Sequence, residues 1–283
     1  MFKAIFLDFF DIKCYTFFMK PNNELFSGSF YFQQSTNIKG SKSDNHYHNL
    51  IEIYYMKKGT CNYFIDDRSY RVKAGDIVFI PDGTIHKTNY DCVYHDRWLI
   101  NCSYEFIPKS LLPLVKRLPH LFVKSTITLD CERIMKKIGE EYARADEFSN
   151  DALKGLISEL MFLFVRNADY QSEQTSKNLL IENVVKYLQQ NYMAEVSLFL
   201  TADNFSVSPE HLSRTFKKQT GFGFNEYLTL LRLQKAEEML KNEPGKSVNE
   251  VAFACGFNDS NYFSFKFKKA YGVSPLKVKN KKA

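Results

Sequence analysis

Three histidines and one glutamate stand at spacings that suit ligand chemistry. His46 and His48 are two residues apart, so their side chains point to the same face if the segment is a strand. Glu52 and His86 follow, the latter after a turn at residues 81–83. Three imidazoles and a carboxylate suit a first-row divalent ion such as Mn, Fe, Ni or Zn. The same groups also suit the polar lining of a small-molecule pocket, and both interpretations stay open.

These residues, with the glycines around them, resemble the two cupin motifs. The first motif, G(x)5HxH(x)3E(x)6G, is matched by Gly40, His46, His48, Glu52 and Gly59. The second, G(x)5PxG(x)2H, is matched by Gly75, Pro81, Gly83 and His86, but Tyr90 replaces the closing Asn. The resemblance implies a cupin-like fold and, in an enzyme, metal binding by His46, His48, Glu52 and His86.

Short segments rich in aromatic and β-branched residues are expected to form the strands that position these groups. The segments are residues 26–32, 51–59, 61–72, 76–83 and 96–106. Turn residues such as Asp66-Asp67 separate them. Their spacing predicts a β-barrel or jelly roll over residues 19–127. Its ligand site is expected to include Tyr54 and Tyr63 beside the histidines and Glu52.

The first residues and the cysteines bear on where the chain works. Asp8 and Asp11 interrupt the apolar start, and no small-residue cleavage site follows, so a signal peptide is not indicated. The start is also too short and too acidic to cross a membrane. We hypothesise that residues 1–18 are an upstream extension absent from the working protein. The six cysteines lack metal spacing, which indicates reduced thiols and a cytoplasmic location.

Residues 128–167 carry helical periodicity. Ile134, Ile138 and Tyr142 recur at every fourth position. They are followed by an apolar stripe that is wider than one face of a helix. Two interpretations stay open: part of this stripe packs on the barrel and part on another subunit, or the helix is wholly buried. Residues 168–177 are polar and aperiodic, which predicts an interdomain linker.

The excess positive charge is confined to the last third of the chain. The net charge is +6, and from Lys177 onward Lys and Arg outnumber Asp and Glu by 16 to 10. Residues 1–176 are therefore neutral. A basic end favours a polyanion such as DNA as a partner.

Two segments of this basic region repeat one pattern. HLSRTFKKQTG and YFSFKFKKAYG share the order apolar, Ser, x, x, Phe, Lys, Lys, x, x, Gly. Each follows a short amphipathic helix and begins after a good N-cap, Ser208 or Asp259. Gly221 and Gly272 supply the stops. The repeat predicts two helix-turn-helix units.

The stretches LSRTFKK, GFNDSNYFSFKFKK and GVSP, with the Tyr227–Ala236 segment, strongly resemble the DNA-binding domain of the AraC/XylS family. We assign residues 178–283 to this domain. The resemblance implies an α+β protein of two domains: a cupin-like barrel with following helices, then an all-α domain. A linker helix of about 18 residues is ~27 Å long. It suits two recognition helices near the ~34 Å separation of successive major-groove faces.

The exposed N-terminal positions of each recognition helix should enter the DNA groove. In the first helix we expect contacts from Glu210, His211, Ser213, Arg214, Lys217 and Lys218. In the second we expect them from Ser260, Asn261, Ser264, Phe265, Lys266 and Lys268. Arg214 is the expected guanine reader and Asn261 an adenine reader, with the lysines near phosphates. A solvated face remains the alternative for Lys217, Lys218 and Lys269.

The sequence departs from the family pattern at several positions. Phe265 stands where the family usually has Arg, so the second unit is expected to read a thymine methyl or to contact only the DNA backbone. Val278 and Lys279 replace a Tyr-Arg pair. Phe199 and Leu200 stand where polar residues are common, and they either dock the sensor domain or shift the helix register.

The resemblance implies a ligand-responsive transcription factor, an activator by family likeness, and not an enzyme. Its expected partners are double-stranded promoter DNA, a small-molecule effector such as a sugar or related metabolite, RNA polymerase and a second copy of the chain. No membrane and no cofactor are expected, apart from the divalent metal left open above. The alternatives are a cupin metalloenzyme or metal-dependent sensor that uses His46, His48, Glu52 and His86, and an architectural DNA binder that senses nothing.

Overall fold

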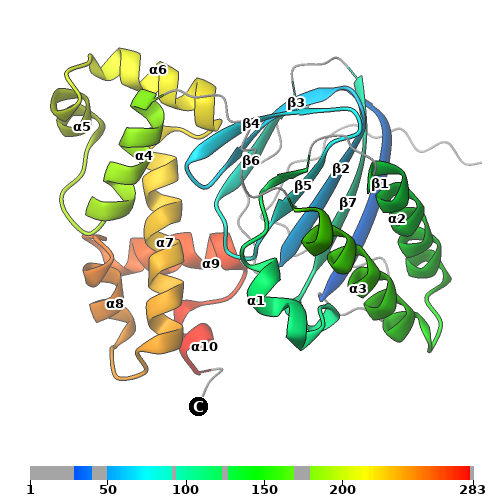
Figure 1. Ribbon diagram of the computed structural model, residues 1–283. Helices are drawn as coiled ribbons and strands as arrows, with labels where there is room; N and C mark the ends of the chain where they lie inside the picture. The colour runs from blue at the N-terminus through cyan, green and yellow to red at the C-terminus, as the bar shows by residue number, and fades with distance from the viewer. Residues whose placement is uncertain (1–28, 40–49, 91–93, 123–126, 169–178, 281–283) are drawn as a thin grey trace, which may run out of the picture.

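The computed structural model describes residues 29–39, 50–90, 94–122, 127–168 and 179–280. The first four ranges form a strand domain covered by helices, and the last forms an all-helical domain (Figure 1). Residues 1–18, Gly40, His46, His48 and nearly all of the expected linker lie outside the described residues. Within the described ranges, no helix is both long enough and apolar enough to cross a membrane.

The strand domain consists of two antiparallel sheets. The strands are β1 (Phe30–Lys39), β2 (Ile51–Lys58), β3 (Thr60–Ile65), β4 (Arg68–Lys73), β5 (Ile77–Ile80), β6 (His86–Tyr90), β7 (Tyr94–Cys102) and β8 (Leu121–Phe122). The larger sheet has the order β1-β7-β2-β5-β8, and the smaller has the order β4-β3-β6. The strand at β6 was not expected, because its polar sequence HKTNY hides the alternation that its pairing with β3 reveals.

Alternation along the strands divides their side chains between two cores. On β2, Ile51, Ile53 and Tyr55 belong to the core shared with the following helices. Tyr54 and Met56 point the other way, into a core that also contains Tyr63 of the smaller sheet. Successive side chains of a strand face opposite sides, so the two sheets face each other across this inner core.

Helices cover the outer face of the larger sheet. After β7 come two short 3-10 helices, Tyr104–Phe106 and Lys109–Leu111, then α1 (Leu112–Val115), α2 (Ile127–Arg144) and α3 (Ser149–Asn167). The apolar stripe of α3 is buried against the sheet, where Phe164 contacts Phe79 and Phe122 at ring-centroid distances of 6.3 and 4.8 Å. Phe162 lies on the opposite side of α3 and is exposed.

Seven helices make up the described part of the C-terminal domain. They are α4 (Leu179–Asn191), α5 (Leu198–Asn204), α6 (Pro209–Thr220), α7 (Phe224–Asn242), α8 (Val248–Ala254), α9 (Ser260–Tyr271) and α10 (Pro275–Asn280). The predicted caps are confirmed. The Ser208 side chain accepts a hydrogen bond from the His211 backbone N at 3.2 Å, and Asp259 accepts one from the Tyr262 N at 2.6 Å. Gly221 and Gly272 end α6 and α9 at φ values of 77° and 69°, which glycine adopts without strain.

The repeat seen in the sequence is a repeat in the structure. Helices α6 and α9 each have 12 residues, and each follows a shorter helix, α5 or α8. The first unit packs around Leu212 and Phe216, and the second around Phe263 and Phe267. Helix α7 contributes residues to both cores and joins the two units (Figure 1).

The turn between α8 and α9 depends on a glycine. Gly256 has φ +82°, and a Cβ atom there would lie 2.6 Å from the Tyr192 carbonyl oxygen. We therefore expect Gly256→Ala to lower the free energy of unfolding by about 1–3 kcal/mol, measured by urea denaturation. Gly245→Ala is the matched control, because a Cβ atom there meets nothing within 4 Å. Equal stability of the two variants would contradict this account of the turn.

Candidate DNA-binding face and effector site

The expected contacts of the first unit share one exposed face of α6. Glu210, His211, Arg214, Lys217 and Lys218 are exposed and Ser213 is half-buried, opposite the buried Leu212 and Phe216. The Arg214 Nε donates to the Glu210 carbonyl oxygen at 3.4 Å, within its own helix. The Arg214 guanidinium makes no ion pair among the described residues. A free fork at the N-terminal half of the helix suits the guanine-reading role predicted for Arg214.

The second unit presents a more apolar face. Asn261, Phe265 and Lys268 are exposed on α9, and Phe265 is 64% exposed. The Lys266 Nζ lies 5.2 Å above the Tyr262 ring, which leaves this lysine half-buried. Tyr262, itself exposed, was not among the contacts expected from the sequence. Its alignment with His211 of the first unit was the signal that marked it.

The two units are held together by α7 and one arginine. Arg232 of α7 donates from Nε to the Tyr192 carbonyl oxygen at 2.8 Å and from Nη2 to the Ala194 carbonyl oxygen at 3.0 Å. These carbonyls follow α4, so the arginine ties the first unit to the middle of α7. With 19 residues, α7 is about 28 Å long. Its length matches the expectation for a helix that spaces two recognition helices.

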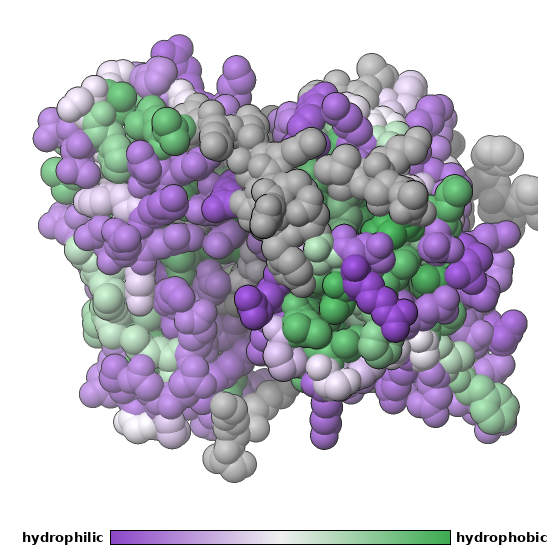
Figure 2. Space-filling view, in the orientation of Figure 1, coloured by the Kyte–Doolittle hydropathy of each residue, from purple (hydrophilic) through white to green (hydrophobic). Residues whose placement is uncertain are grey.

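Phe199 and Leu200 are not docked on the part of the strand domain that the structure describes. Both lie on α5, and their exposed fractions are 69% and 48%. Figure 2 shows a hydrophobic area over α4 and α5 on an otherwise largely hydrophilic helical domain. Helix α5 begins with the Ser197 side chain accepting from the Leu200 backbone N at 3.2 Å. The two side chains therefore occupy the outer face of a normally capped helix.

Four of the residues expected at the effector site lie together between the two sheets. Tyr63 donates a hydrogen bond to the Glu52 carboxylate, and the Tyr63 and Tyr54 rings meet edge to face at 5.4 Å. The His86 Nε2 lies 3.6 Å from Glu52 Oε2, and its Nδ1 lies 2.7 Å from the Thr84 carbonyl oxygen. All four side chains are buried. Because only His Nδ1 can donate to that carbonyl, the proton of neutral His86 belongs on Nδ1.

Burial and the Glu52 carboxylate both shift the pKa values in this cluster. Burial raises the pKa of Tyr63 well above its usual value, and the Glu52 carboxylate raises it further, so the phenol keeps its proton. Burial alone would lower the pKa of His86, but Glu52 and the Thr84 carbonyl more than offset it, and the pKa is raised. The result is a connected polar group in the inner core between the two sheets.

The metal interpretation gains no support from the described residues. Among them, no three His, Cys, Asp or Glu side chains are placed to hold a metal ion. Glu52 accepts from Tyr63 and from the Asn101 Nδ2 at 3.3 Å, so its oxygens already have donors. Four cysteines, Cys61, Cys102, Cys131 and Cys255, are buried and free, as expected, and none of them adds a ligand.

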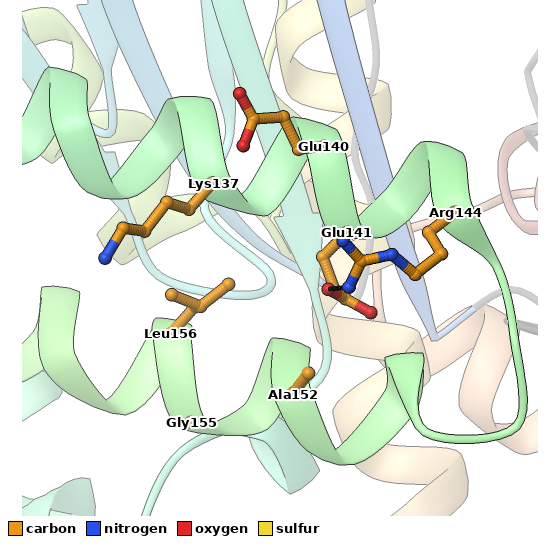
Figure 3. A pocket seen from close by; sticks show the side chains of 7 residues that line it. All are labelled: Lys137, Glu140, Glu141, Arg144, Ala152, Gly155 and Leu156. Carbon is orange, nitrogen blue, oxygen red and sulfur yellow. Dashed lines mark hydrogen bonds and ion pairs between the residues drawn. The ribbon is translucent and has the colours of Figure 1, made fainter.

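A separate surface groove lies between α2 and α3. Figure 3 shows it lined by Lys137, Glu140, Glu141, Arg144, Ala152, Gly155 and Leu156, with the Arg144–Glu141 ion pair, 2.7 Å long, at one end. It is on the far side of the helices from the inner core. None of the expected effector-site residues lines it.

The strand domain also contacts the first helix-turn-helix unit, which the sequence did not indicate. Phe64 of β3 and Ile85 belong to the core of that unit. Phe64 meets Phe222 at 6.2 Å and Tyr227 at 6.0 Å between ring centroids. The Lys87 Nζ lies 4.8 Å above the Phe222 ring. Alternation on β3 could have marked Phe64 as facing away from the inner core, but not what it faces.

Comparison with known families identifies the class of protein. The AraC-like ligand binding domain matches residues 34–102, and a helix-turn-helix domain matches residues 201–281. The chain belongs to the AraC/XylS family of DNA-binding transcription regulators, with an N-terminal ligand-binding domain. It is a regulator and not an enzyme, which removes the cupin metalloenzyme alternative.

Individual relatives cover most of the chain. The HTH-type transcriptional activator RhaS of Klebsiella pneumoniae (strain 342) is 26% identical over 242 residues, which is 83% of this chain and 86% of the relative. RhaS of Escherichia coli (strain K12 / DH10B) has the same identity and coverage. Among solved structures, the C-terminal domain of AraT from Geobacillus stearothermophilus is 32% identical over 37% of this chain and 86% of that chain, at a TM-score of 0.35.

The face of α6 yields a prediction about sequence reading. Arg214→Ala should weaken binding to the protein's preferred DNA site by about 1–3 kcal/mol and relax preference at one base pair, because a bidentate guanine contact is lost. Binding to a library of single-base-pair variants of the site measures both effects.

Lys268→Ala on α9 provides the contrast. It should weaken binding to all variants alike and lower the salt dependence, and Lys136→Ala on α2 should do neither. Unchanged sequence preference in Arg214→Ala would show that this residue is not a base reader.

Proposed function

We propose that this protein is a ligand-responsive transcription activator. A small molecule, such as a sugar or related metabolite, binds between the sheets of the strand domain and changes how the helical domain engages promoter DNA. The naming of the RhaS relatives as activators supports the sign of the regulation. The work of a promoter regulator implies RNA polymerase as a further partner and a cytoplasmic location.

The observation that carries this proposal is the alternation on two strands of the smaller sheet. On β3, Tyr63 points inward to Glu52, whereas its neighbour Phe64 points outward to the helical domain. On β6, His86 points inward to Glu52 and its neighbour Lys87 points outward over Phe222. Each strand thus joins the effector site to the DNA-binding domain within two consecutive residues, so a shift at one face moves the other.

Hydrogen bonds between the domains surround this packing. The Ser69 Oγ donates to the Gln219 carbonyl oxygen at 3.1 Å, and the Gln234 Nε2 donates to the Gly83 carbonyl oxygen at 2.7 Å. In the β3–β4 turn, the Asp66 carboxylate accepts from the Gln189 Nε2 at 3.1 Å. The bonded carbonyl of Gln219 lies at the C-terminal end of α6, so the predicted reading face at its N-terminal end stays exposed.

Among the described residues, the strand domain shares an apolar core with the first unit. The core of the second unit contains no residue of the strand domain, whereas that of the first contains Phe64 and Ile85. The contact can have two arrangements, and an effector that binds the inner core more tightly in one of them shifts the population toward that arrangement. We therefore place the effect of the ligand on the first unit, which carries Arg214.

The remaining assignments follow from this function. We propose that α6 and α9 contact DNA through the twelve residues named for them above. Effector binding is assigned to Glu52, Tyr54, Tyr63 and His86, joined by His46 and His48. The proposed boundaries are those of the sequence: 19–127 for the barrel, 128–167 for the packing helices, 168–177 for the linker and 178–283 for the DNA-binding domain.

A homodimer through α2 and α3 accounts for their outer face. Phe162 and Leu129 are exposed there, and the groove of Figure 3 runs between the same two helices. Exposed apolar side chains and a groove on the same paired helices support helix packing between two copies.

The proposed activation is tested with a reporter. The preferred DNA site, selected from random duplexes with the purified protein, is placed upstream of a weak promoter. Expression should rise when the protein is produced, and Arg214→Ala should abolish most of that rise. A fall in expression would establish a repressor and contradict the proposal.

Interdomain coupling is tested by calorimetry. The intact contact should make the two domains unfold in one transition. Phe64→Ala removes the packing on Phe222 and Tyr227, so two transitions are expected. Phe253→Ala, which truncates an exposed ring of α8, is the control and should keep one transition. A single transition in Phe64→Ala at unchanged DNA affinity would mean that this contact does not couple the domains.

A further inference from the structure

Arg97 is a positive charge inside the strand domain that forms no ion pair with a carboxylate of the described residues. It lies on β7, opposite Ser35 on β1 and Met56 on β2, and Met56 belongs to the inner core. Residues directly opposite in a sheet share a face, so Arg97 points between the two sheets. It is two strand positions from Leu99 and four from Asn101, the donor to Glu52.

The contacts of Arg97 leave part of its hydrogen-bonding capacity unused. Its Nη2 donates to the Gln33 Oε1 at 3.4 Å, a long hydrogen bond, and its Cζ lies 5.9 Å from the Tyr54 ring centroid. Its Nε is buried and has no hydrogen-bond partner among the described residues. A buried donor without a partner is destabilising, because its desolvation is not compensated. A guanidinium offers its donors in a planar fork that fits a carboxylate or phosphate.

The neighbours of Arg97 are donors and rings. His95 on the same strand is 1% exposed, and its Nδ1 also lacks a partner among the described residues. Its ring stacks on Tyr90 at 3.7 Å between centroids, and the Tyr90 hydroxyl lies 3.3 Å from that of Tyr54. The hydroxyl and imidazole groups can donate to an anion beside the guanidinium.

The inward carboxylate of this core is already engaged. Glu52 accepts from Tyr63 and Asn101 and lies beside His86, and no ion pair joins it to Arg97. The polar interior therefore has two parts: a carboxylate matched by its own donors, and a guanidinium with unmatched donors around it.

From this juxtaposition we infer that the effector is an anion, a small metabolite with a carboxylate or phosphate group that Arg97 binds with help from His95 and the tyrosines. This inference rests on the proposed effector site and adds the charge of the ligand. For a sugar-like effector, it selects a uronic or aldonic acid or a sugar phosphate over the neutral sugar.

Matched pairs of neutral and acidic ligands isolate the charge. Thermal unfolding of the full chain is followed with D-glucose and D-glucuronate, D-galactose and D-galacturonate, and D-glucose 6-phosphate, at constant ionic strength. We expect at least one anion to raise the Tm where its neutral partner does not. Arg97→Gln should weaken that apparent affinity about 10-fold or more, and Arg71→Gln, on an exposed position of β4, should not change it.

A second measurement does not depend on choosing the right metabolite. The Arg97 Nε–H resonance, assigned by its loss in Arg97→Lys, is followed in ¹⁵N-edited NMR spectra during titration with acetate and, separately, with chloride. A saturable shift with acetate alone is expected. No acetate-specific shift, together with no stabilising anion, would overturn the inference.

The outcomes also separate this inference from the proposed function. A neutral sugar that stabilises the wild type and Arg97→Gln equally would overturn the anionic class while a ligand-responsive regulator remains. Failure of the reporter or of DNA binding would count against the proposed function, whatever binds at Arg97.

Discussion

The period of two along a β-strand is the constraint on which the rest of this structure depends. It forces neighbouring side chains of β3 and β6 to opposite faces, so one sheet of three strands serves two cores at once. Its inner face meets the polar cluster around Glu52, and its outer face supplies Phe64 to the helical domain. A register shift of one residue would exchange the two faces. It would remove both the inner polar cluster and the packing of Phe64 on the helical domain.

The same contact makes the two helix-turn-helix units unequal. They repeat in sequence and in helix length, but among the residues that the structure describes only the first shares its core with the strand domain. Its proposed recognition helix carries Arg214, whereas the equivalent position in α9 is Phe265. The unit that we propose to read bases through hydrogen bonds is thus the one whose core includes Phe64 of the strand domain.

The sequence predicted those features that depend on local pattern. The caps at Ser208 and Asp259, the glycine stops and the two units follow from short-range chemistry that few residues determine. Contacts between distant segments could not be predicted from the sequence. Strand β6 is recognisable only from its pairing with β3, and Phe64 could be assigned to an outer face but not to Phe222 and Tyr227. The surroundings of Arg97 could not be predicted either, because they include residues of other strands that are distant in the sequence.

The strength of the contact between the domains suits regulation better than permanent attachment. Burial of a phenylalanine contributes about 1.5–3 kcal/mol, and each hydrogen bond between the domains contributes about 1 kcal/mol net. Phe64 and the bonds of Ser69, Asp66 and Gln234 therefore amount to a few kcal/mol. Reversal of a two-state equilibrium from 1:99 to 99:1 takes roughly 5.5 kcal/mol of differential ligand affinity. A charged ligand that satisfies the unmatched donors at Arg97 can supply energy of this order, because hydrogen bonds to charged groups are worth about 1.5–3 kcal/mol each. A much larger interface would hold the first unit in one arrangement whatever the effector did.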